Sequence, residues 1–359
     1  MDVEACEFPS YFVLTVTDKC NLSCDYCYIS SGKNLMGHKT LQKSISEAFS
    51  IAFDDVTFKW IGGEPLLAGK KFFETALKLE KKFSDGRNIQ NIVVTNGTLL
   101  DEDWLDLFQE NNFKIYLSID GPKEIHDSTR KYADGSGSFD NTMRAVELMR
   151  EREMKLRAVC VLSKINGNAV QDLYYFFREN QINFKIYPLG YGCGQEKLRL
   201  TPADLGKSFV SLFDLWYSDS SHEITITTFK KIIKNMLASP QGKSMSMHNC
   251  HRKYFRIRWD GDVFACNRQM KDNAFCIGNI NEQSYPDIIN SKKFLAFYKE
   301  QSEMVKCYDC TWLRVCQGGC MRNAFLYQGS ISHPDYYCEG YTSLFDHIAK
   351  KLGVQTSSN

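Results

Sequence analysis

The chain has 359 residues, a formal net charge of +1, 43% hydrophobic residues and 24% charged residues. These are the values of a folded globular protein, and the near-neutral charge creates no overall field that would attract nucleic acid or an anionic membrane. No apolar run is long enough to span a bilayer, and the first ten residues lack the basic and apolar segments of a secretory signal, so we expect a cytoplasmic protein.

The first half of the chain alternates strand-like and helix-like segments. Segments rich in β-branched and aromatic residues predict six strands, at 11–17, 56–61, 91–95, 114–119, 155–162 and 183–189. Apolar residues with helical spacing predict helices between them, at 40–53, 70–83, 100–111, 139–152 and 168–180. This alternation predicts an α/β fold with a parallel sheet, a partial (β/α)6 TIM-like barrel, with an open doubly wound sheet as the alternative.

The pattern changes near residue 200. A helical segment without strands follows, and beyond it short elements and cysteines predominate, as expected where metal centres replace part of a core. We therefore predict four parts: a barrel at 1–199, a helical linker at 200–247, a cysteine-rich domain at 248–345 and a C-terminal tail at 346–359.

Ten of the fourteen cysteines fall into two spaced sets. The first set follows the first strand as C-x3-C-x2-C and consists of Cys20, Cys24 and Cys27. The second set lies in the last third of the chain and consists of Cys250, Cys266, Cys307, Cys310, Cys316, Cys320 and Cys338. Thiolates are the ligands of iron–sulfur clusters, whereas a disulfide framework is typical of short secreted chains. Zinc remains an alternative for the second set, because paired C-x2-C units are its usual ligands.

Polar and glycine-rich motifs follow the predicted strands. Gly-Gly-Glu-Pro at 62–65 follows the second strand, Asn96 follows the third, and Ser118 and Asp120 lie at the end of the fourth. The C-terminal ends of parallel barrel strands share one rim, which is where active sites are built. We therefore expect these motifs to converge on the first cysteine set.

The C-x3-C-x2-C motif with Tyr26, followed by Gly-Gly-Glu-Pro, resembles the radical S-adenosylmethionine (SAM) superfamily, and the seven later cysteines resemble its SPASM extension. The resemblance covers nearly the whole chain. It implies three [4Fe–4S] clusters, one radical SAM cluster and two auxiliary clusters, with S-adenosylmethionine bound at an open iron of the first. Cleavage of S-adenosylmethionine would give a 5′-deoxyadenosyl radical that removes a hydrogen atom from the substrate.

The resemblance also assigns roles to single residues. Glu64 would bind the methionyl ammonium, and Arg130 is the candidate for the carboxylate of S-adenosylmethionine, because a guanidinium binds a carboxylate with two hydrogen bonds. Tyr26 would pack near the adenine, and Gly62 and Gly63 would let the backbone approach the methionyl group. The full set of expected cofactor-binding residues is Tyr26, Gly62, Gly63, Glu64, Asn96, Ser118, Asp120 and Arg130.

The SPASM pattern divides the second cysteine set between two auxiliary clusters. One would be held by Cys307, Cys310, Cys316 and Cys338, and the other by Cys250, Cys266 and Cys320. The second cluster usually has a further cysteine shortly before the first of these, but 242–249 contains none. Cys276, Cys193 and His248 are candidates to complete it, and an open iron is the alternative.

Enzymes with SPASM domains mostly modify peptides or proteins, and two subclasses are similar to this chain. Sulfatase-maturating enzymes make formylglycine with an aspartate base directly after the second SPASM cysteine, but this chain has Asn267 there, and an amide cannot accept the proton. We therefore predict a maturase that crosslinks side chains of a ribosomally made precursor peptide, forming a cyclophane, another C–C bond, an ether or a thioether. Formylglycine formation is the alternative, and a non-catalytic iron–sulfur electron carrier is the alternative from another class.

The expected partners follow from this prediction. They are a precursor peptide and an electron donor such as flavodoxin or ferredoxin. The residues before the first strand are too few for a leader-binding domain, so a leader would dock on the catalytic domain, on the SPASM region or on a separate leader-binding protein. Neither nucleic acid nor a membrane is expected.

Overall fold

The computed structural model describes residues 10–29, 32–52, 55–192, 194, 196–238, 254–266, 268, 273–302 and 307–354. The chain divides into two compact units that are interleaved in sequence. The first unit comprises Met1–Ser118, Lys131–Lys155 and Cys250–Tyr298, and the second comprises Ile119–Arg130, Leu156–Asn249 and Lys299–Asn359. No helix of the described residues is long and apolar enough to cross a membrane.

The first unit is built on a sheet in the order β4-β3-β2-β1-β7-β8-β9. Its strands are β1 (Tyr11–Thr17), β2 (Val56–Gly62), β3 (Ile89–Thr95), β4 (Lys114–Ser118), β7 (Tyr254–Arg258), β8 (Asp262–Phe264) and β9 (Cys276–Asn279). Strands β1 to β4 are parallel neighbours and β7 pairs parallel with β1, whereas β8 and β9 are antiparallel additions. The first four strands lie within two residues of their predicted bounds.

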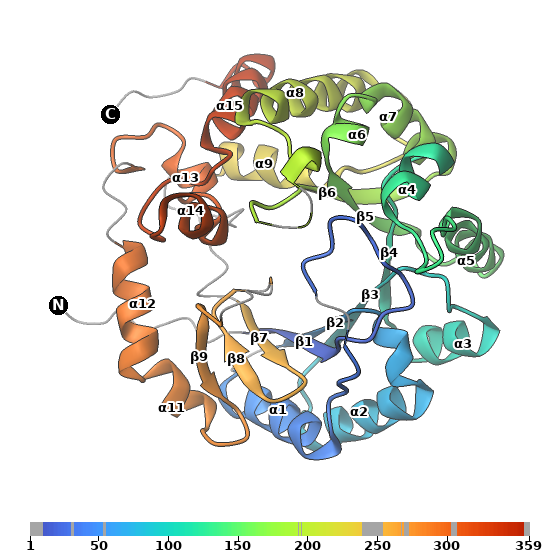
Figure 1. The fold of residues 1–359 in the computed structure, drawn as a ribbon, viewed down its shortest axis with the longest axis vertical. Coiled ribbons are helices and arrows are strands. Elements are labelled where there is room, and N and C mark those ends of the chain that lie inside the picture. The colour runs from blue at the N-terminus through green and yellow to red at the C-terminus, as the bar shows by residue number, and fades with distance from the viewer. Residues whose placement is uncertain are drawn as a thin grey trace. The chain divides into compact units, whose positions relative to one another are not determined.

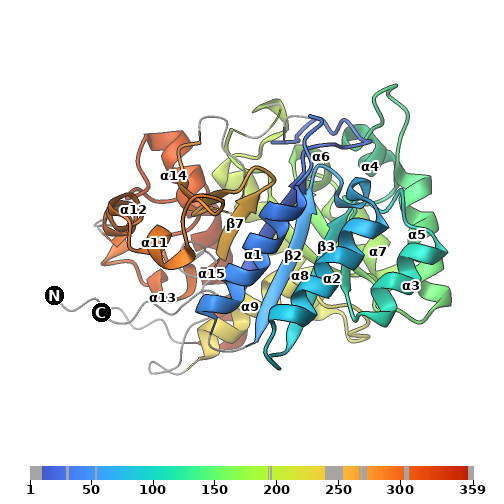
Figure 2. The ribbon, with the colours of Figure 1, turned by 90° about the horizontal axis from the view of Figure 1, so that it is seen from below.

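Helices cover one face of this sheet (Figures 1 and 2). They are α1 (His38–Ile51), the short 3-10 helix η1 (Pro65–Ala68), α2 (Lys70–Phe83), α3 (Glu102–Glu110), α5 (Phe139–Glu151), α11 (Tyr285–Ile289) and α12 (Lys292–Ser302), the last of which begins in this unit. An aromatic core joins the two layers: Trp60 of β2 packs against Phe73 of α2, and Phe73 packs against Phe108 of α3. These side chains are fully buried. Because such a core is closely packed, the loops at the ends of the strands are attached to a rigid part of the protein.

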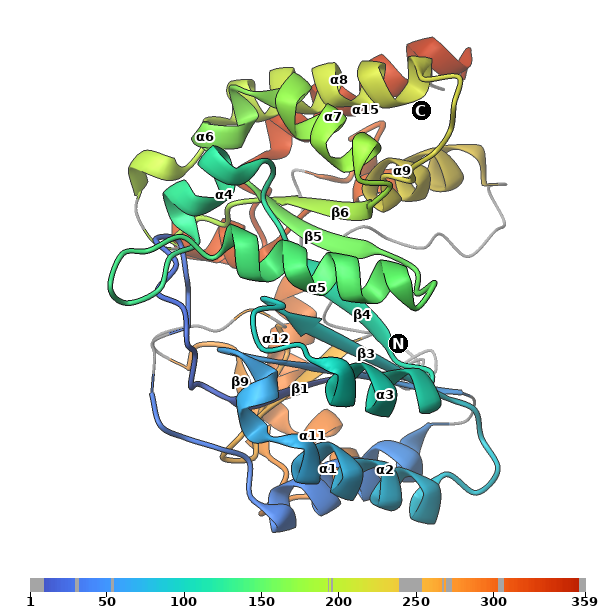
Figure 3. The same cartoon turned by 90° about the vertical axis from the view of Figure 1, so that its right-hand side faces the viewer.

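The second unit contains the remaining predicted strands, β5 (Arg157–Leu162) and β6 (Asn183–Pro188), which are parallel. Figure 3 shows these strands beside a layer of helices in which α8 packs against α15. The helices of this unit are α4 (Lys123–Thr129), α6 (Lys164–Gly167), α7 (Val170–Glu179), η2 (Glu196–Leu198), α8 (Pro202–Ser218), α9 (Thr227–Leu237), α13 (Leu313–Cys316), α14 (Met321–Gln328) and α15 (Cys338–Leu352).

Two predictions about the C-terminal third need correction. The strand pattern does not end at 248, because Tyr254–Arg258 forms β7, which pairs with β1 in the sheet of the first unit. The predicted tail at 346–359 is also too long, because α15 continues to Leu352 and buries Ile348 and Ala349. The other predicted domain boundaries remain predictions.

Candidate iron–sulfur and S-adenosylmethionine sites

The first cysteine set lies in the loop that leaves β1. The amide of Leu22 donates a hydrogen bond to Cys20 Sγ at 3.4 Å, and the amide of Cys27 donates to the Cys24 carbonyl at 3.0 Å, which forms a tight turn between two of the three thiols. Burial, together with charge repulsion from Glu64, Cys24 and Cys27, raises the pKa of Cys20 to about 12, although the hydrogen bond from the Leu22 amide acts in the opposite direction. A bound iron–sulfur cluster would supply the positive charge that favours the thiolate state of these cysteines.

Asp18 shapes this loop and was missed by the sequence analysis. Its carboxylate accepts hydrogen bonds from the Asn34 backbone amide at 2.8 Å and the Asn34 side chain at 2.6 Å, and its carbonyl accepts one from the Gly32 amide. These contacts tie the residues after Cys27 back to the end of β1. An Asp two residues before the first cysteine was the available signal.

Gly62, the last residue of β2, and Gly63, which follows it, let this part of the chain lie against the cysteine loop. A Cβ on Gly62 would lie 2.5 Å from the Thr17 carbonyl oxygen, and a Cβ on Gly63 would lie 2.3 Å from that of Lys19. The Gly63 amide donates to the Thr17 carbonyl at 2.9 Å. The sequence analysis attributed both glycines to S-adenosylmethionine contact; the structure gives an additional reason, which is the close approach of two backbones.

Glu64 joins three segments of the first unit. Its fully buried carboxylate accepts hydrogen bonds from the Thr95 hydroxyl at 2.7 Å, the Asn96 amide at 2.8 Å and the Leu66 amide at 3.1 Å. Burial raises its pKa to about 7, and these hydrogen bonds act in the opposite direction. Three protein donors already use this carboxylate, so it fixes the loops after β2 and β3, and its contact with a methionyl ammonium remains a prediction.

Asn96 extends this network to the cysteine loop. Its side-chain amide donates to Asn21 Oδ1 at 2.9 Å, and the Asn21 amide donates to the Thr98 hydroxyl at 2.8 Å. Tyr26 is buried in the same loop, with 7% of its surface exposed, and Ser118 is half-buried at the end of β4. The structure therefore brings the cysteine, glycine-rich and Asn96 loops together, as expected for one rim of a parallel sheet.

Asp120 and Arg130 pair with each other in the second unit. Arg130 Nε lies 2.8 Å from Asp120 Oδ2 and Nη2 lies 3.3 Å from Oδ1, and both side chains are nearly buried. Asp120 also accepts the Val161 amide at 2.8 Å. Burial, with repulsion from the Arg130 charge, lowers the pKa of neighbouring His126 to about 4. Two N–H groups of Arg130 already donate to Asp120. Binding of the S-adenosylmethionine carboxylate by Arg130 therefore remains a prediction.

Four cysteines of the second set meet around one cavity in the second unit. Its lining includes Cys307, Cys310, Cys316 and Cys338, with Trp312 and Phe345 forming apolar walls. Burial raises the pKa of Cys316, and so do Asp335 and the other three thiols. The cavity thus brings together the four thiols that the SPASM pattern assigns to one auxiliary cluster.

The remaining auxiliary ligands are only partly described. Cys266 is buried just after β8, in the first unit, and the Arg268 amide donates to its Sγ at 3.5 Å. Cys320 precedes α14, in the second unit. Cys276, a candidate for the missing ligand, donates to the Gly278 carbonyl at 3.6 Å. The residues Cys250, Cys193, His248 and Asn267 lie outside the described residues.

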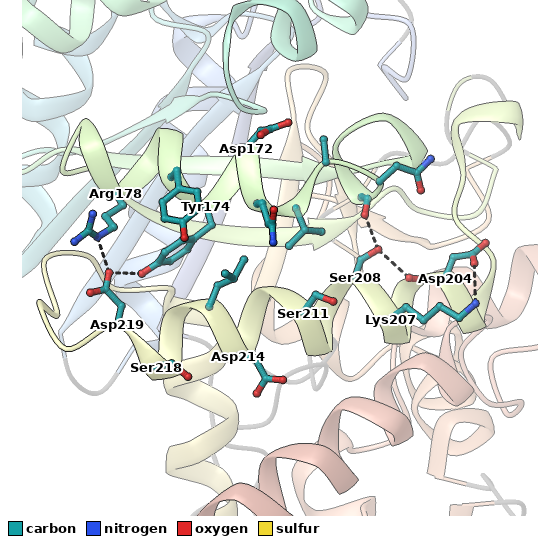
Figure 4. A pocket seen from close by; sticks show the side chains of 17 residues that line it. Asp172, Tyr174, Arg178, Asp204, Lys207, Ser208, Ser211, Asp214, Ser218 and Asp219 are labelled. Atoms are coloured by element: carbon teal, nitrogen blue, oxygen red, sulfur yellow. Dashed lines mark hydrogen bonds and ion pairs between the residues drawn. The ribbon is translucent and has the colours of Figure 1, made fainter.

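A separate open groove of about 1030 Å³ lies between the α6–α7 segment and α8 (Figure 4). Its charged side chains are largely paired: Asp219 accepts hydrogen bonds from Arg178 and Tyr174, and Asp204 lies 3.9 Å from Lys207. The groove shares no lining residue with the cysteine cavity.

Two family models match the chain. Residues 14–175 match the radical SAM superfamily, and residues 249–311 match the iron–sulfur cluster-binding SPASM domain. A cysteine-type anaerobic sulfatase-maturating enzyme of Clostridium perfringens is 30% identical, over 96% of this chain and 97% of its own length. A serine-type anaerobic sulfatase-maturating enzyme of Bacteroides thetaiotaomicron is also 30% identical, over 92% of this chain and 87% of its own length. The solved structure of native anSMEcpe with bound AdoMet and the Cp18Cys peptide superposes with a TM-score of 0.85 at 29% identity, covering 96% of this chain and 98% of that one.

These similarities confirm the predicted α/β fold with its SPASM domain, and the predicted cofactors, three [4Fe–4S] clusters and S-adenosylmethionine. The chain is a radical SAM enzyme. The prediction of a crosslinking maturase was wrong: relatives that match nearly the whole chain are sulfatase-maturating enzymes of both types. The error came from giving one departing side chain, Asn267, more weight than the similarity of the rest of the chain to that subclass. The chain belongs to the family of anaerobic sulfatase-maturating enzymes.

Proposed function

We propose that the protein oxidises a cysteine or serine side chain of a sulfatase-derived peptide or protein to formylglycine. The observation that carries this proposal is the 30% identity to a cysteine-type and to a serine-type sulfatase-maturating enzyme, each over more than nine tenths of this chain. Similarity to both types leaves both substrate residues open. An electron donor such as flavodoxin or ferredoxin belongs to this proposal, as does a cytoplasmic location, whereas the leader-binding protein expected for a crosslinking enzyme does not.

The radical SAM cluster would be held by Cys20, Cys24 and Cys27, in the loop where Asp18 ties the chain back to β1. When bound, the clusters and S-adenosylmethionine supply a radical that removes one hydrogen atom from the Cβ of the target side chain. The protein's own contribution is to hold the cofactor in place. Glu64 does this by fixing the loops after β2 and β3 with three hydrogen bonds.

The proposed cofactor-binding set is unchanged. It consists of Tyr26, Gly62, Gly63, Glu64, Asn96, Ser118, Asp120 and Arg130. Of these, Glu64 and Asn96 act together in one hydrogen-bonded network of the first unit, and Asp120 and Arg130 act as a pair in the second. Each group is therefore expected to respond to mutation as a unit.

The second half of the oxidation removes one more electron, which an oxidised auxiliary cluster would accept, and the proton of the thiol or hydroxyl. A serine then gives the aldehyde directly, and a cysteine gives a thioaldehyde that water converts to the aldehyde with release of hydrogen sulfide. Asn267 stands where the family has its aspartate base, and an amide cannot accept a proton at neutral pH. Of the two substitutes that the sequence offers, Asp262 is bound to Arg258 and Asn279, whereas Tyr187 is 44% exposed on β6. We infer that deprotonation is slow in this protein.

The test is anaerobic incubation of the reconstituted enzyme with S-adenosylmethionine, a reductant and a sulfatase-derived peptide carrying either cysteine or serine. We expect the serine product to lose two hydrogens and the cysteine product to exchange sulfur for oxygen as well, and both to react with an aldehyde probe in mass spectrometry. The control is Cys24→Ala, which should produce no aldehyde. Cleavage of S-adenosylmethionine without labelling of either peptide would refute the proposal.

A further inference from the structure

Asp335 is a buried carboxylate that the proposed function does not use. It precedes α15 in the second unit, is only 4% exposed, and lies in the lining of the cavity with Cys307, Cys310, Cys316 and Cys338. Its backbone carbonyl accepts a hydrogen bond from the Cys338 amide at 2.9 Å. Gly319 makes room for it, because a Cβ on Gly319 would lie 2.4 Å from the Asp335 Cβ.

Neutral amide groups provide every hydrogen bond that the side chain accepts within the described part of the chain. Oδ1 accepts from the Asn323 side chain at 2.9 Å and from the Tyr337 amide at 3.0 Å, and Oδ2 accepts from the Cys320 amide at 2.8 Å. Among the described residues no lysine, arginine or histidine forms an ion pair with it. The negative charge is therefore held in place but is not cancelled by a neighbouring cation.

This position links the two auxiliary ligand sets. Asp335 lines the cavity of the first set, and it also binds the backbone of Cys320, which the SPASM pattern assigns to the other cluster. The reduction potential of an iron–sulfur cluster depends on nearby charge, on hydrogen bonds and on solvent exposure. A charge shielded from water acts more strongly than one in solvent, because the effective dielectric constant around it is lower.

We propose that Asp335 sets the reduction potential of the auxiliary cluster held by Cys307, Cys310, Cys316 and Cys338, lowering it by placing a fixed negative charge in the wall of the cluster cavity. Electron uptake makes the cluster more negative, so a neighbouring anion disfavours the reduced state. Asp335 is a positioning residue in this role, since it also holds the amide of Cys320. The inference concerns the cofactor and does not depend on which peptide is oxidised.

The chain offers two matched controls. Asp309 lies between the ligands Cys307 and Cys310 but is exposed, so Asp309→Asn removes the same formal charge from solvent. Asn323→Ala removes one of the hydrogen bonds to Asp335 and leaves its charge in place. Only Asp335→Asn removes a buried charge from the cavity wall.

The experiment is an anaerobic redox titration of the three-cluster enzyme, followed by electron paramagnetic resonance. The signal of the cluster in question is the one that disappears in Cys338→Ala. We expect Asp335→Asn to shift its midpoint potential to a more positive value, and Asp309→Asn and Asn323→Ala to shift it less. An unchanged potential in Asp335→Asn, or an equal shift in all three variants, would overturn the proposal.

Loss of the cluster from Asp335→Asn is addressed by a second pair of variants. Asp335→Glu and Asp335→Gln have the same length and differ in charge, so a more positive potential in the glutamine variant would support the proposal. If neither of these variants retains the cluster, or if both have the same potential, the residue acts by shape alone and the proposal fails.

Discussion

Glu80 gives the protein a pH-dependent stability that a single substitution should remove. Glu80 lies on α2 and only 2% of its surface is exposed. Its carboxylate accepts one hydrogen bond, from the Asn91 side chain at 2.7 Å. Asn91 in turn accepts the Trp60 indole N–H at 2.7 Å. The other oxygen, Oε1, has no hydrogen-bond donor within the described residues. Burial raises the pKa of Glu80 from 4.5 to about 8, and the Asn91 hydrogen bond only partly opposes this.

The sign of the effect follows from proton binding. Between pH 4.5 and about 8 the folded protein retains a proton on Glu80 that the unfolded chain has released, so stability falls as the pH rises through this window. At about 1.36 kcal/mol per pKa unit, the whole shift corresponds to about 5 kcal/mol of unfolding free energy. Below pH 4.5 Glu80 is protonated in both the folded and the unfolded protein, so it no longer makes the stability depend on pH.

The substitution is Glu80→Gln, which keeps the shape and the hydrogen bond from Asn91 but cannot ionise. We expect its apparent melting temperature, measured anaerobically by circular dichroism, to exceed that of the parent protein by an amount that grows from pH 5.5 to pH 8. Glu74→Gln is the control, because Glu74 lies on the same helix but is exposed. A difference between Glu80→Gln and the parent that stays constant across this pH range would refute the reasoning.

Three further predictions concern the sites. Cys316→Ala should remove one of three clusters, leaving about eight of about twelve irons by the usual stoichiometry, and iron analysis that still finds all of them would contradict the assignment. Glu64→Gln should weaken S-adenosylmethionine binding by about 1–3 kcal/mol, the scale of a hydrogen bond to a charged group, and calorimetry that gives an unchanged affinity would show that the loops do not need this carboxylate. Asn267→Asp should increase the rate of aldehyde formation from either sulfatase peptide, since it restores a group able to accept a proton, and an unchanged rate would place the base elsewhere.

The sequence alone determined the elements of the barrel and the cofactors. The strand Tyr11–Thr17 and the helix Lys70–Phe83 lie where the period of their apolar residues predicted them, because periodicity records burial on one face of an element. The cysteine spacings, with Gly-Gly-Glu-Pro at 62–65, were sufficient to show the resemblance to the radical SAM superfamily and its SPASM extension, and that resemblance implied the clusters and S-adenosylmethionine.

Only the tertiary structure showed which distant segments pair and which charged side chains are buried. The strand Tyr254–Arg258 pairs with Tyr11–Thr17, which lies at the other end of the sequence, and no local period encodes that pairing. The sequence predicts that Glu64 binds the cofactor. In the folded protein its carboxylate accepts hydrogen bonds from three protein groups, which the sequence did not predict. Asp335 is an ordinary acidic residue in the sequence. It became a candidate for redox tuning because folding places it in the cavity wall and shields its charge from water, and burial of this kind depends on residues distant along the chain.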